Sequence, residues 1–290
     1  MSIDVLIKQR LFGNKTMPLK VILGEHLHYG SFVKDQLKVG ELGETEFVVY
    51  NPKSIGRGFS AVWNPKEKKT IALRLPQPST TQELRDFYDA IERMVTHWHG
   101  NLVVDGSRVS LPDFLSTFEN MVDFNNKIIH QVSQQVLDGK SDTLTLYSTM
   151  WPLTIGKEEA ILFTENSNHY AEWLHEKQSI NVYFASPDFY IGDGGIFARY
   201  ILTNNLPAVF PYQPTVPFGT TDPTTGKQLE CKEWFILIGI EGEKEPLCEM
   251  AYSKFLSLIP ENKKSKYDGN RFLLAEMTEE EIRAFCTQQI

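Results

Sequence analysis

The chain has 290 residues, of which 41% are hydrophobic and 12% aromatic. That is enough apolar surface to bury a core in one large domain or two ordinary ones, and it excludes intrinsic disorder as a description of the whole chain. The formal net charge of −8 is repelled by phosphate backbones and by anionic lipid surfaces, so we expect neither a nucleic-acid nor a membrane partner.

The compartment is predicted from the cysteines and the N-terminus. The chain has three cysteines, Cys231, Cys248 and Cys286, which are widely spaced and include no CxxC pair. We therefore expect reduced thiols rather than a zinc site or a disulfide framework. The opening MSIDVLIKQR alternates apolar and polar residues, unlike the continuous apolar stretch of a signal peptide. We therefore predict a soluble, cytoplasmic protein.

Most of the first 75 residues carry β-strand patterns. Runs of β-branched and aromatic residues end at turn signals such as Asn51-Pro52. The stretch Asn-Pro-Lys-Glu-Lys separates the last two runs, which predicts a β-hairpin with a charged tip. The predicted strands cover residues 2–7, 20–23, 46–50, 59–63 and 70–75.

An amphipathic helix follows. Thr80 and Glu83 have the spacing of a capping box, in which each side chain bonds a free backbone N–H at the helix start. Apolar residues then recur every three or four positions as far as Trp98. This periodicity predicts a helix over residues 80–98 with one buried face, and residues 101–105 predict a strand after it.

A second helix is predicted from Ser110 to Asp138, where Gly139 supplies a left-handed cap. At 1.5 Å per residue it would be about 40 Å long, a length that often joins two halves of a molecule. Asn125 falls on its apolar stripe. That polar residue either fixes the packing register, which is the commoner role, or faces a cleft.

The second half of the chain alternates strand and helix signals. Residues 234–240 are strongly apolar, as in a central strand covered on both faces, and Thr278 with Glu281 forms another capping box. Residues 203–228 are rich in Pro, Thr and Gly, and such long segments are often lids or contact surfaces. The other predicted strands are residues 143–147, 160–163, 181–185, 197–202 and 272–275, and the predicted helices are residues 168–177, 246–259 and 278–288.

The order of these signals predicts an internal duplication. His28-Tyr29 aligns with His169-Tyr170, and residues 70–75 align with residues 234–239. We predict an α+β fold of two tandem, sequence-diverged copies of a mainly antiparallel sheet-plus-helix unit, joined by the long helix. The copies would cover residues 1–140 and 141–290, the second with a Pro/Thr-rich hairpin insertion at residues 203–228.

Two glycine-spaced stretches have the look of phosphate-binding loops: IGRGF at residues 55–59 and IGDGGIF at residues 191–197. Dinucleotide and P-loop cradles require a helix directly after the glycines, because its N-terminal N–H groups bind the phosphate. Both stretches here are followed by strand-like residues. The glycines therefore predict turns or bulges that need positive φ rather than a nucleotide site.

Several residues are candidates for a site. His97 and His99 are the most ligand-like pair, although a metal needs a third ligand and histidine near a helix C-terminus is also favoured by the helix dipole. His28, Tyr29, His169 and Tyr170 would line related pockets, or pack as ordinary structural residues. Arg57 and Asp193 occupy the same place between the glycines, either as a salt bridge or as solvated turn residues.

Two classes of function remain open. The sequence has no GxSxG elbow, no local Cys-His signature and no HExxH motif. This favours a non-catalytic scaffold that binds another protein, such as a basic one, and we expect no cofactor. The alternative is an enzyme or a small-molecule binder, metal-dependent or not, with its site between the two repeats.

The stretch EFVVYNPKSIGRGFSAVW and the opening MSIDVLIKQR resemble an uncharacterised family of Gram-positive bacterial proteins, catalogued only as a domain of unknown function. The resemblance covers most of the chain. It implies no activity and no catalytic residues, and it implies a bacterial, cytosolic setting.

Overall fold

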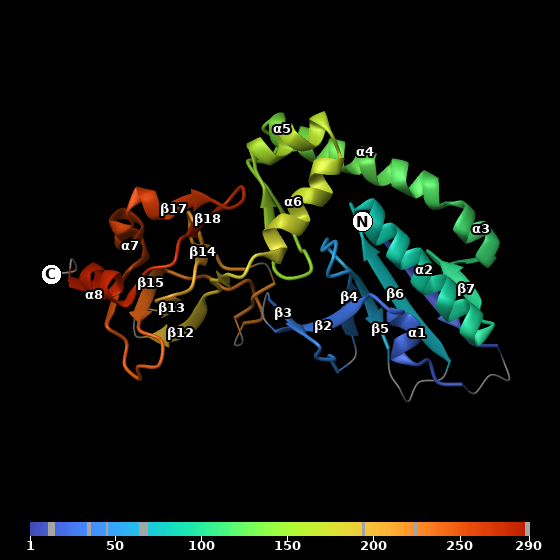
Figure 1. Ribbon diagram of the computed structural model, residues 1–290, viewed down its shortest axis with the longest axis horizontal. Helices are drawn as coiled ribbons and strands as arrows, with labels where there is room; N and C mark the ends of the chain where they lie inside the picture. Colours follow the sequence, from blue (N-terminus) through green and yellow to red (C-terminus); the bar gives the residue numbers. More distant parts are fainter. Residues whose placement is uncertain are drawn as a thin grey trace. The chain divides into compact units, whose positions relative to one another are not determined.

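The structure, a computed structural model, describes residues 1–10, 15–33, 36–44, 46–63, 69–192, 195–217, 219–222 and 225–287. The chain forms two compact units, Met1–Ile180 and Asn181–Ile290. Both combine helices with mainly antiparallel sheets, so the predicted α+β class is confirmed (Figure 1). Within these ranges, every helix is too short or too polar to cross a bilayer.

The first unit is built on an eight-stranded sheet in the order β3-β2-β4-β5-β6-β1-β7-β8, and all its pairs are antiparallel. Its strands alternate buried and exposed side chains, as expected for a sheet with one face on the core. The strands are β1 (Ser2–Lys8), β2 (His28–Val33), β3 (Gln36–Val39), β4 (Glu46–Tyr50), β5 (Phe59–Val62), β6 (Thr70–Pro76), β7 (Asn101–Val104) and β8 (Ser107–Val109).

Helix α2 (Thr81–Trp98) covers one face of this sheet and buries the predicted apolar stripe against it. The predicted capping box is confirmed: the Glu83 N–H donates to Thr80 Oγ1, and the Thr80 N–H donates to Glu83 Oε2. The other elements of this unit are the helices α1 (Leu19–Leu23), α3 (Leu111–Ser116), α4 (Phe118–Leu137), α5 (Lys157–Glu165) and α6 (Asn168–Ser179), and the paired strands β9 (Leu144–Leu146) and β10 (Leu153–Ile155).

Three predictions for this unit are wrong. Residues 20–23 lie in α1 and residues 160–163 in α5, not in strands. Short apolar runs suit either state, and the helices are decided by their surroundings. The predicted long helix is broken at Thr117, whose hydroxyl donates to the Phe114 carbonyl and also contacts the Tyr88 hydroxyl. This local bond competes with the helical pattern and separates α3 from α4.

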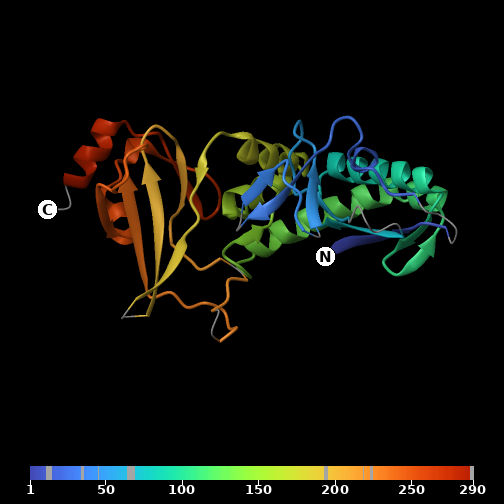
Figure 2. The same ribbon diagram turned by 90° about the horizontal axis from the view of Figure 1, so that it is seen from below.

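The second unit contains two four-stranded sheets, β12-β13-β15-β16 and β11-β14-β18-β17. Helices α7 and α8 pack with both sheets around one core (Figure 2). The elements are β11 (Tyr183–Phe184), β12 (Asp188–Gly192), β13 (Gly195–Thr203), β14 (Ala208–Pro211), β15 (Glu233–Gly239), β16 (Cys248–Ala251), α7 (Tyr252–Leu258), a 3₁₀ turn (Glu261–Lys263), β17 (Lys264–Lys266), β18 (Arg271–Leu274) and α8 (Glu279–Thr287). The predicted helix over residues 246–259 is therefore wrong in its first part, which is β16.

The tandem duplication is not confirmed. The aligned strands β6 and β15 pair differently with the strands that follow the two glycine stretches: β6 is antiparallel to β5, whereas β15 is parallel to β13. The connection between β13 and β15 is consequently a crossover that contains β14. Residues 28–29 lie in a strand and residues 169–170 in a helix. Similar strand and turn signals therefore occur in different topologies.

The prediction of three reduced thiols is also wrong. Cys248 in β16 and Cys286 in α8 form a disulfide, and only Cys231 is free. The two cysteines are 38 residues apart in sequence. Their spacing in the sequence did not indicate a disulfide, because the two cysteines come together only when α8 packs in the folded unit.

Candidate functional site

The first glycine stretch wraps around the carboxylate of Glu83, the third residue of α2. Glu83 Oε1 accepts hydrogen bonds from the backbone N–H groups of Arg57 and Gly58, the latter at 2.6 Å. Glu83 Oε2 accepts the Thr80 N–H at 2.8 Å. The loop does present its N–H groups to an anion, as a phosphate-binding loop would. That anion is a side chain of the protein itself.

The geometry explains both glycines. A Cβ at Gly56 would overlap the carboxyl group of Glu83, and Gly58 has a φ of +69°, which L-residues rarely adopt. The predicted turn with positive φ is therefore confirmed at Gly58. Burial raises the pKa of Glu83, opposed by the hydrogen bonds from Thr80, Gly58 and Arg57 that favour the carboxylate.

The glycine loop is fixed from further directions. The Gly56 carbonyl accepts hydrogen bonds from Gln178 Nε2 in α6 at 2.8 Å and from the Thr149 N–H at 3.2 Å. The Ile55 N–H donates to His175 Nδ1 at 3.1 Å. Helices α2 and α6 and the segment after β9 thus hold one turn of the chain, which makes its conformation specific.

The neighbouring turn between β6 and α2 is held in the same way. The Pro78 carbonyl accepts the Tyr170 hydroxyl at 3.1 Å, and the Ser79 N–H donates to Asn125 Oδ1 at 2.7 Å. Asn125 is buried and also donates to the Met121 carbonyl. The structural role expected for this residue is thus fulfilled by a bond to a loop rather than by an exposed cleft position.

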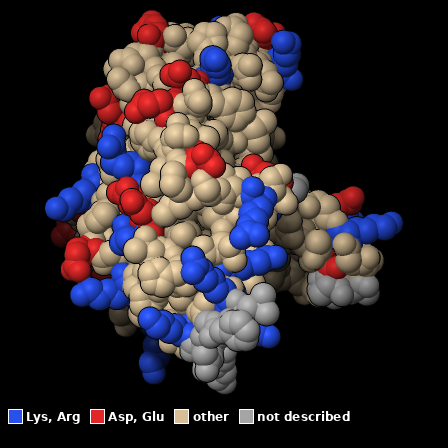
Figure 3. Space-filling model, turned by 90° about the vertical axis from the view of Figure 1, so that its right-hand side faces the viewer, with Lys and Arg blue, Asp and Glu red and all other residues tan. Residues whose placement is uncertain are grey.

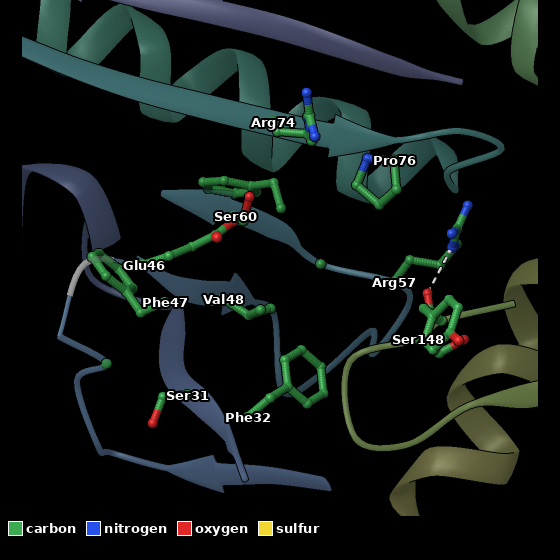
Figure 4. A pocket seen from close by; sticks show the side chains of 14 residues that line it. Ser31, Phe32, Glu46, Phe47, Val48, Arg57, Ser60, Arg74, Pro76 and Ser148 are labelled. Atoms are coloured by element: carbon green, nitrogen blue, oxygen red, sulfur yellow. Dashed lines mark hydrogen bonds between the residues drawn. The ribbon is translucent and has the colours of Figure 1, made fainter. Parts of the chain in front are cut away.

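A cavity of about 410 Å³ lies next to the glycine loop, on the face of the eight-stranded sheet that α2 does not cover (Figure 4). Its floor is the outward face of three adjacent strands, where Val48 opposes Ser60 and Ser60 opposes Arg74. Phe32 from β2 and Tyr147 after β9 form walls, and their side chains are 46% and 47% exposed. The volume lies in the range of small-molecule sites.

Polar groups stand at both ends of this cavity. At one end, Arg57 Nε donates to the Tyr147 carbonyl at 2.9 Å, next to the buried Ser148 (Figure 4). At the other end, Arg74 Nε donates to Asp4 Oδ1 at 2.6 Å, and this bond lowers the pKa of Asp4. The cavity therefore has apolar walls with one arginine at each end, and one of these is paired with an acid.

Arg57 is the predicted site residue that lines this cavity. It converges with Tyr170 on the Pro78 carbonyl, which Arg57 Nη1 reaches at 3.4 Å. Tyr170 is fully buried, and burial raises its pKa well above the ordinary range. His169 bonds Glu172 at 3.0 Å on the surface of α6.

His28 and Tyr29 lie in β2, outside the set of described cavity-lining residues. His28 is exposed and meets the ring of Tyr50 edge-on, while Tyr29 packs edge-on against Phe47. Among the described residues, no hydrogen bond or ring contact joins this pair to His169 or Tyr170. A pocket common to both pairs stays a prediction.

The second glycine stretch lies in a hairpin between β12 and β13, where Gly192 pairs with Gly195. Gly195 has a φ of +116°, so a turn with positive φ is confirmed here too. Asp193 and Gly194 lie outside the described residues, so the predicted partnership of Asp193 with Arg57 is left as a prediction.

The predicted metal pair lies at the end of α2. His97 faces an open groove between α1 and α2 together with His26, and His99 is the helix cap with a φ of 47°. Across the described ranges, no three His, Cys, Asp or Glu side chains come together as a metal site. His97 and His99 therefore have no third ligand among these residues.

Sequence reasoning missed the residues around Arg57. Glu83 was recognised only as a helix cap, and Ser148, Phe32 and Arg74 carried no motif. A signal existed for Glu83 alone: a capping-box glutamate satisfies one N–H, and its second oxygen remains available for a nearby glycine loop.

A family model described as Domain of unknown function (DUF4299) matches residues 2–285. No curated protein and no solved structure matches the chain. The resemblance drawn from the sequence is confirmed at this level, while the Gram-positive origin stays a prediction. Because the match spans nearly the whole sequence, the protein belongs to the DUF4299 family, a domain of unknown function.

Proposed function

We propose that the protein is a non-catalytic binding protein and that the cavity beside the glycine loop receives a small molecule with an apolar body. One observation carries this proposal: a concave site of about 410 Å³ with mainly apolar walls and few polar groups. Such sites are the usual form of small-molecule pockets. All of its described lining residues belong to the first unit.

The chemistry of the lining supports binding rather than catalysis. The ionisable groups among the described lining residues are Glu46, Arg57, Arg74 and Tyr147. An arginine stays protonated at ordinary pH and is a poor proton shuttle. Nucleophilic catalysis by a serine needs an adjacent base, and the hydrogen bonds of the described residues bring no histidine to Ser31, Ser60 or Ser148.

The proposal is tested by filling the cavity. We expect some members of a panel of small apolar compounds to raise the melting temperature of the wild type by several degrees, because a ligand selective for the native state stabilises it. Ser60→Trp, on the cavity floor, should remove this shift. Val62→Trp is the matched control, since Val62 lies two residues along the same strand and outside the cavity lining.

The results separate the alternatives. Ligand shifts that persist in Ser60→Trp would place the site elsewhere and overturn the proposal, and so would the absence of any stabilising compound. Loss of the shift in Ser60→Trp with its retention in Val62→Trp supports it.

A second candidate is the protein-binding scaffold expected from the sequence. Around the edge strand β3, Phe32, Val33, Val39 and Leu42 are exposed, and exposed apolar groups at a sheet edge favour protein contacts. Binding of a protein partner would be lost in Val39→Glu and kept in Ser60→Trp. On the face in Figure 3, acidic and basic side chains are interspersed in the upper part and basic ones predominate in the lower part, so that face offers no acidic field to select a basic partner.

A further inference from the structure

We infer that the ligand of this cavity carries a carboxylate, held between the guanidinium of Arg57 and the hydroxyl of Ser148. The inference rests on the proposed function and adds the chemical class of the ligand. The apolar body of the ligand would lie over Val48 and Phe32, on the floor and wall of the cavity.

The guanidinium of Arg57 is held in place before any ligand arrives. The backbone N–H of Arg57 donates a hydrogen bond to the Glu83 carboxyl group. In the guanidinium, Nε donates to the Tyr147 carbonyl at 2.9 Å and Nη1 donates to the Pro78 carbonyl at 3.4 Å. These side-chain partners are neutral carbonyl groups. In the part of the chain that the structure describes, no salt bridge joins Arg57 to an acid. The buried Glu83 carboxyl group acts on the Arg57 charge only through space, so this charge is partly compensated and can still attract an anion.

Ser148 supplies the second observation. It is 2% exposed and lines the cavity, and its Oγ has no hydrogen-bond partner among the described residues. A buried hydroxyl without a partner is unfavourable. Ser148 follows Tyr147, the residue whose carbonyl holds Arg57, so both donors stand at the same end of the cavity (Figure 4). A carboxylate there would accept from both.

The other end of the cavity is unsuited to an anion. Arg74 is already paired with Asp4, and the nearby Glu46 carboxylate adds to the field that raises the pKa of Arg74. The polarity of the cavity therefore sets the orientation of the ligand, with its carboxylate at Arg57. Charge-assisted hydrogen bonds from arginine to carboxylate are among the stronger polar contacts in proteins.

The test compares three compounds with the same apolar body: 4-phenylbutyrate, 4-phenylbutanol and 4-phenylbutylamine. Calorimetric titration of the full chain should give the acid roughly 10- to 100-fold tighter binding than the alcohol, as expected for hydrogen bonds to a charged group. Arg57→Met should abolish this preference and leave the alcohol bound. Arg74→Met is the control: Arg74 lines the same cavity but is paired with Asp4, so this variant should keep the preference for the acid.

Ser148→Ala keeps the inference testable if the Arg57→Met variant fails to fold, because this substitution removes only a buried hydroxyl. It should weaken the acid several-fold and leave the alcohol unchanged. A free acid and the C-terminal carboxylate of a peptide offer the same chemistry. A short N-acetylated peptide ending in Phe-Leu, as acid and as amide, distinguishes the two sources by its affinity relative to 4-phenylbutyrate.

The two proposals fail differently. Equal binding of acid and alcohol, blocked by Ser60→Trp, would overturn the carboxylate inference and leave the binding function standing. A preference for the acid that survives both Arg57→Met and Ser148→Ala would also overturn it. Absence of binding by all three compounds and by the peptides would overturn the inference and count against the cavity as a ligand site.

Discussion

At the scale of single residues, the glycine loop is specified by what it encloses. Gly56 leaves room for the Glu83 carboxyl group, and Gly58 turns the chain so that its N–H points at the same oxygen as the N–H of Arg57. An ordinary side chain at Gly58 would meet Val48 Cγ1 at 2.7 Å and the Val49 carbonyl at 2.9 Å. The close approach adds to the cost of the positive φ.

The two costs can be separated by a matched pair of variants. Gly58→Ala and Gly139→Ala both place alanine at a φ of +69°, but a Cβ at Gly139 would meet nothing within 4 Å. We expect Gly139→Ala to lower the free energy of unfolding by about 1–2 kcal/mol, and Gly58→Ala to lower it by a further 1–3 kcal/mol or so from overpacking. Equal losses in urea unfolding would show that Gly58 needs only its backbone conformation.

At the scale of elements, the start of α2 joins a helix to a β-loop through one side chain. Glu83 caps its own helix through Thr80 and binds the loop before β5 through Arg57 and Gly58. A glutamine has one acceptor oxygen in place of two, so it must leave one of these N–H groups unpaired. The orientation of α2 against the sheet depends on this residue as well as on the apolar stripe.

Glu83→Gln should therefore lower the free energy of unfolding by roughly 1–3 kcal/mol, the usual effect of an unpaired buried polar group. Burial raises the pKa of Glu83 in the folded state above its ordinary value of 4.5. Its contribution to stability is complete below that value and is lost as the pH rises through the folded-state pKa. The difference between wild type and variant should shrink from pH 4 to pH 7 in urea unfolding; a difference that grows would contradict the raised pKa.

At the scale of the whole molecule, the chain consists of two units with separate cores. The first relies on one large sheet and the polar network around the glycine loop. The second has a disulfide that joins β16 to α8, whose Ile282 and Phe285 are buried in the core. The last helix is thus held by a covalent bond as well as by packing.

Cys286→Ser should destabilise the second unit. Closing a 38-residue separation contributes about 2–4 kcal/mol in the loop-entropy description. Hydrogen exchange should rise in peptides from residues 181–287 and stay unchanged in the core of the first unit. Cys231→Ser is the control, because Cys231 is free. A uniform rise across both units would show that they do not unfold separately.

The sequence by itself determined the features that one turn or one helix face encodes. The capping box of α2, its buried stripe and the positive φ of Gly58 depend on residues a few positions apart, and each was predicted. The same local information favoured a turn over a nucleotide site at residues 55–59. Local rules could go no further, because they do not say which distant side chain a loop will meet.

Only the tertiary structure decided the rest. The occupant of the glycine loop, Glu83, lies 25 residues after Gly58, and the partner of Cys248 lies 38 residues away. Short apolar runs such as α1 fit a strand or a helix equally well until packing selects one. The cavity itself exists because strands β4, β5 and β6 present Val48, Ser60 and Arg74 side by side, and such pairing is a long-range property of the folded chain.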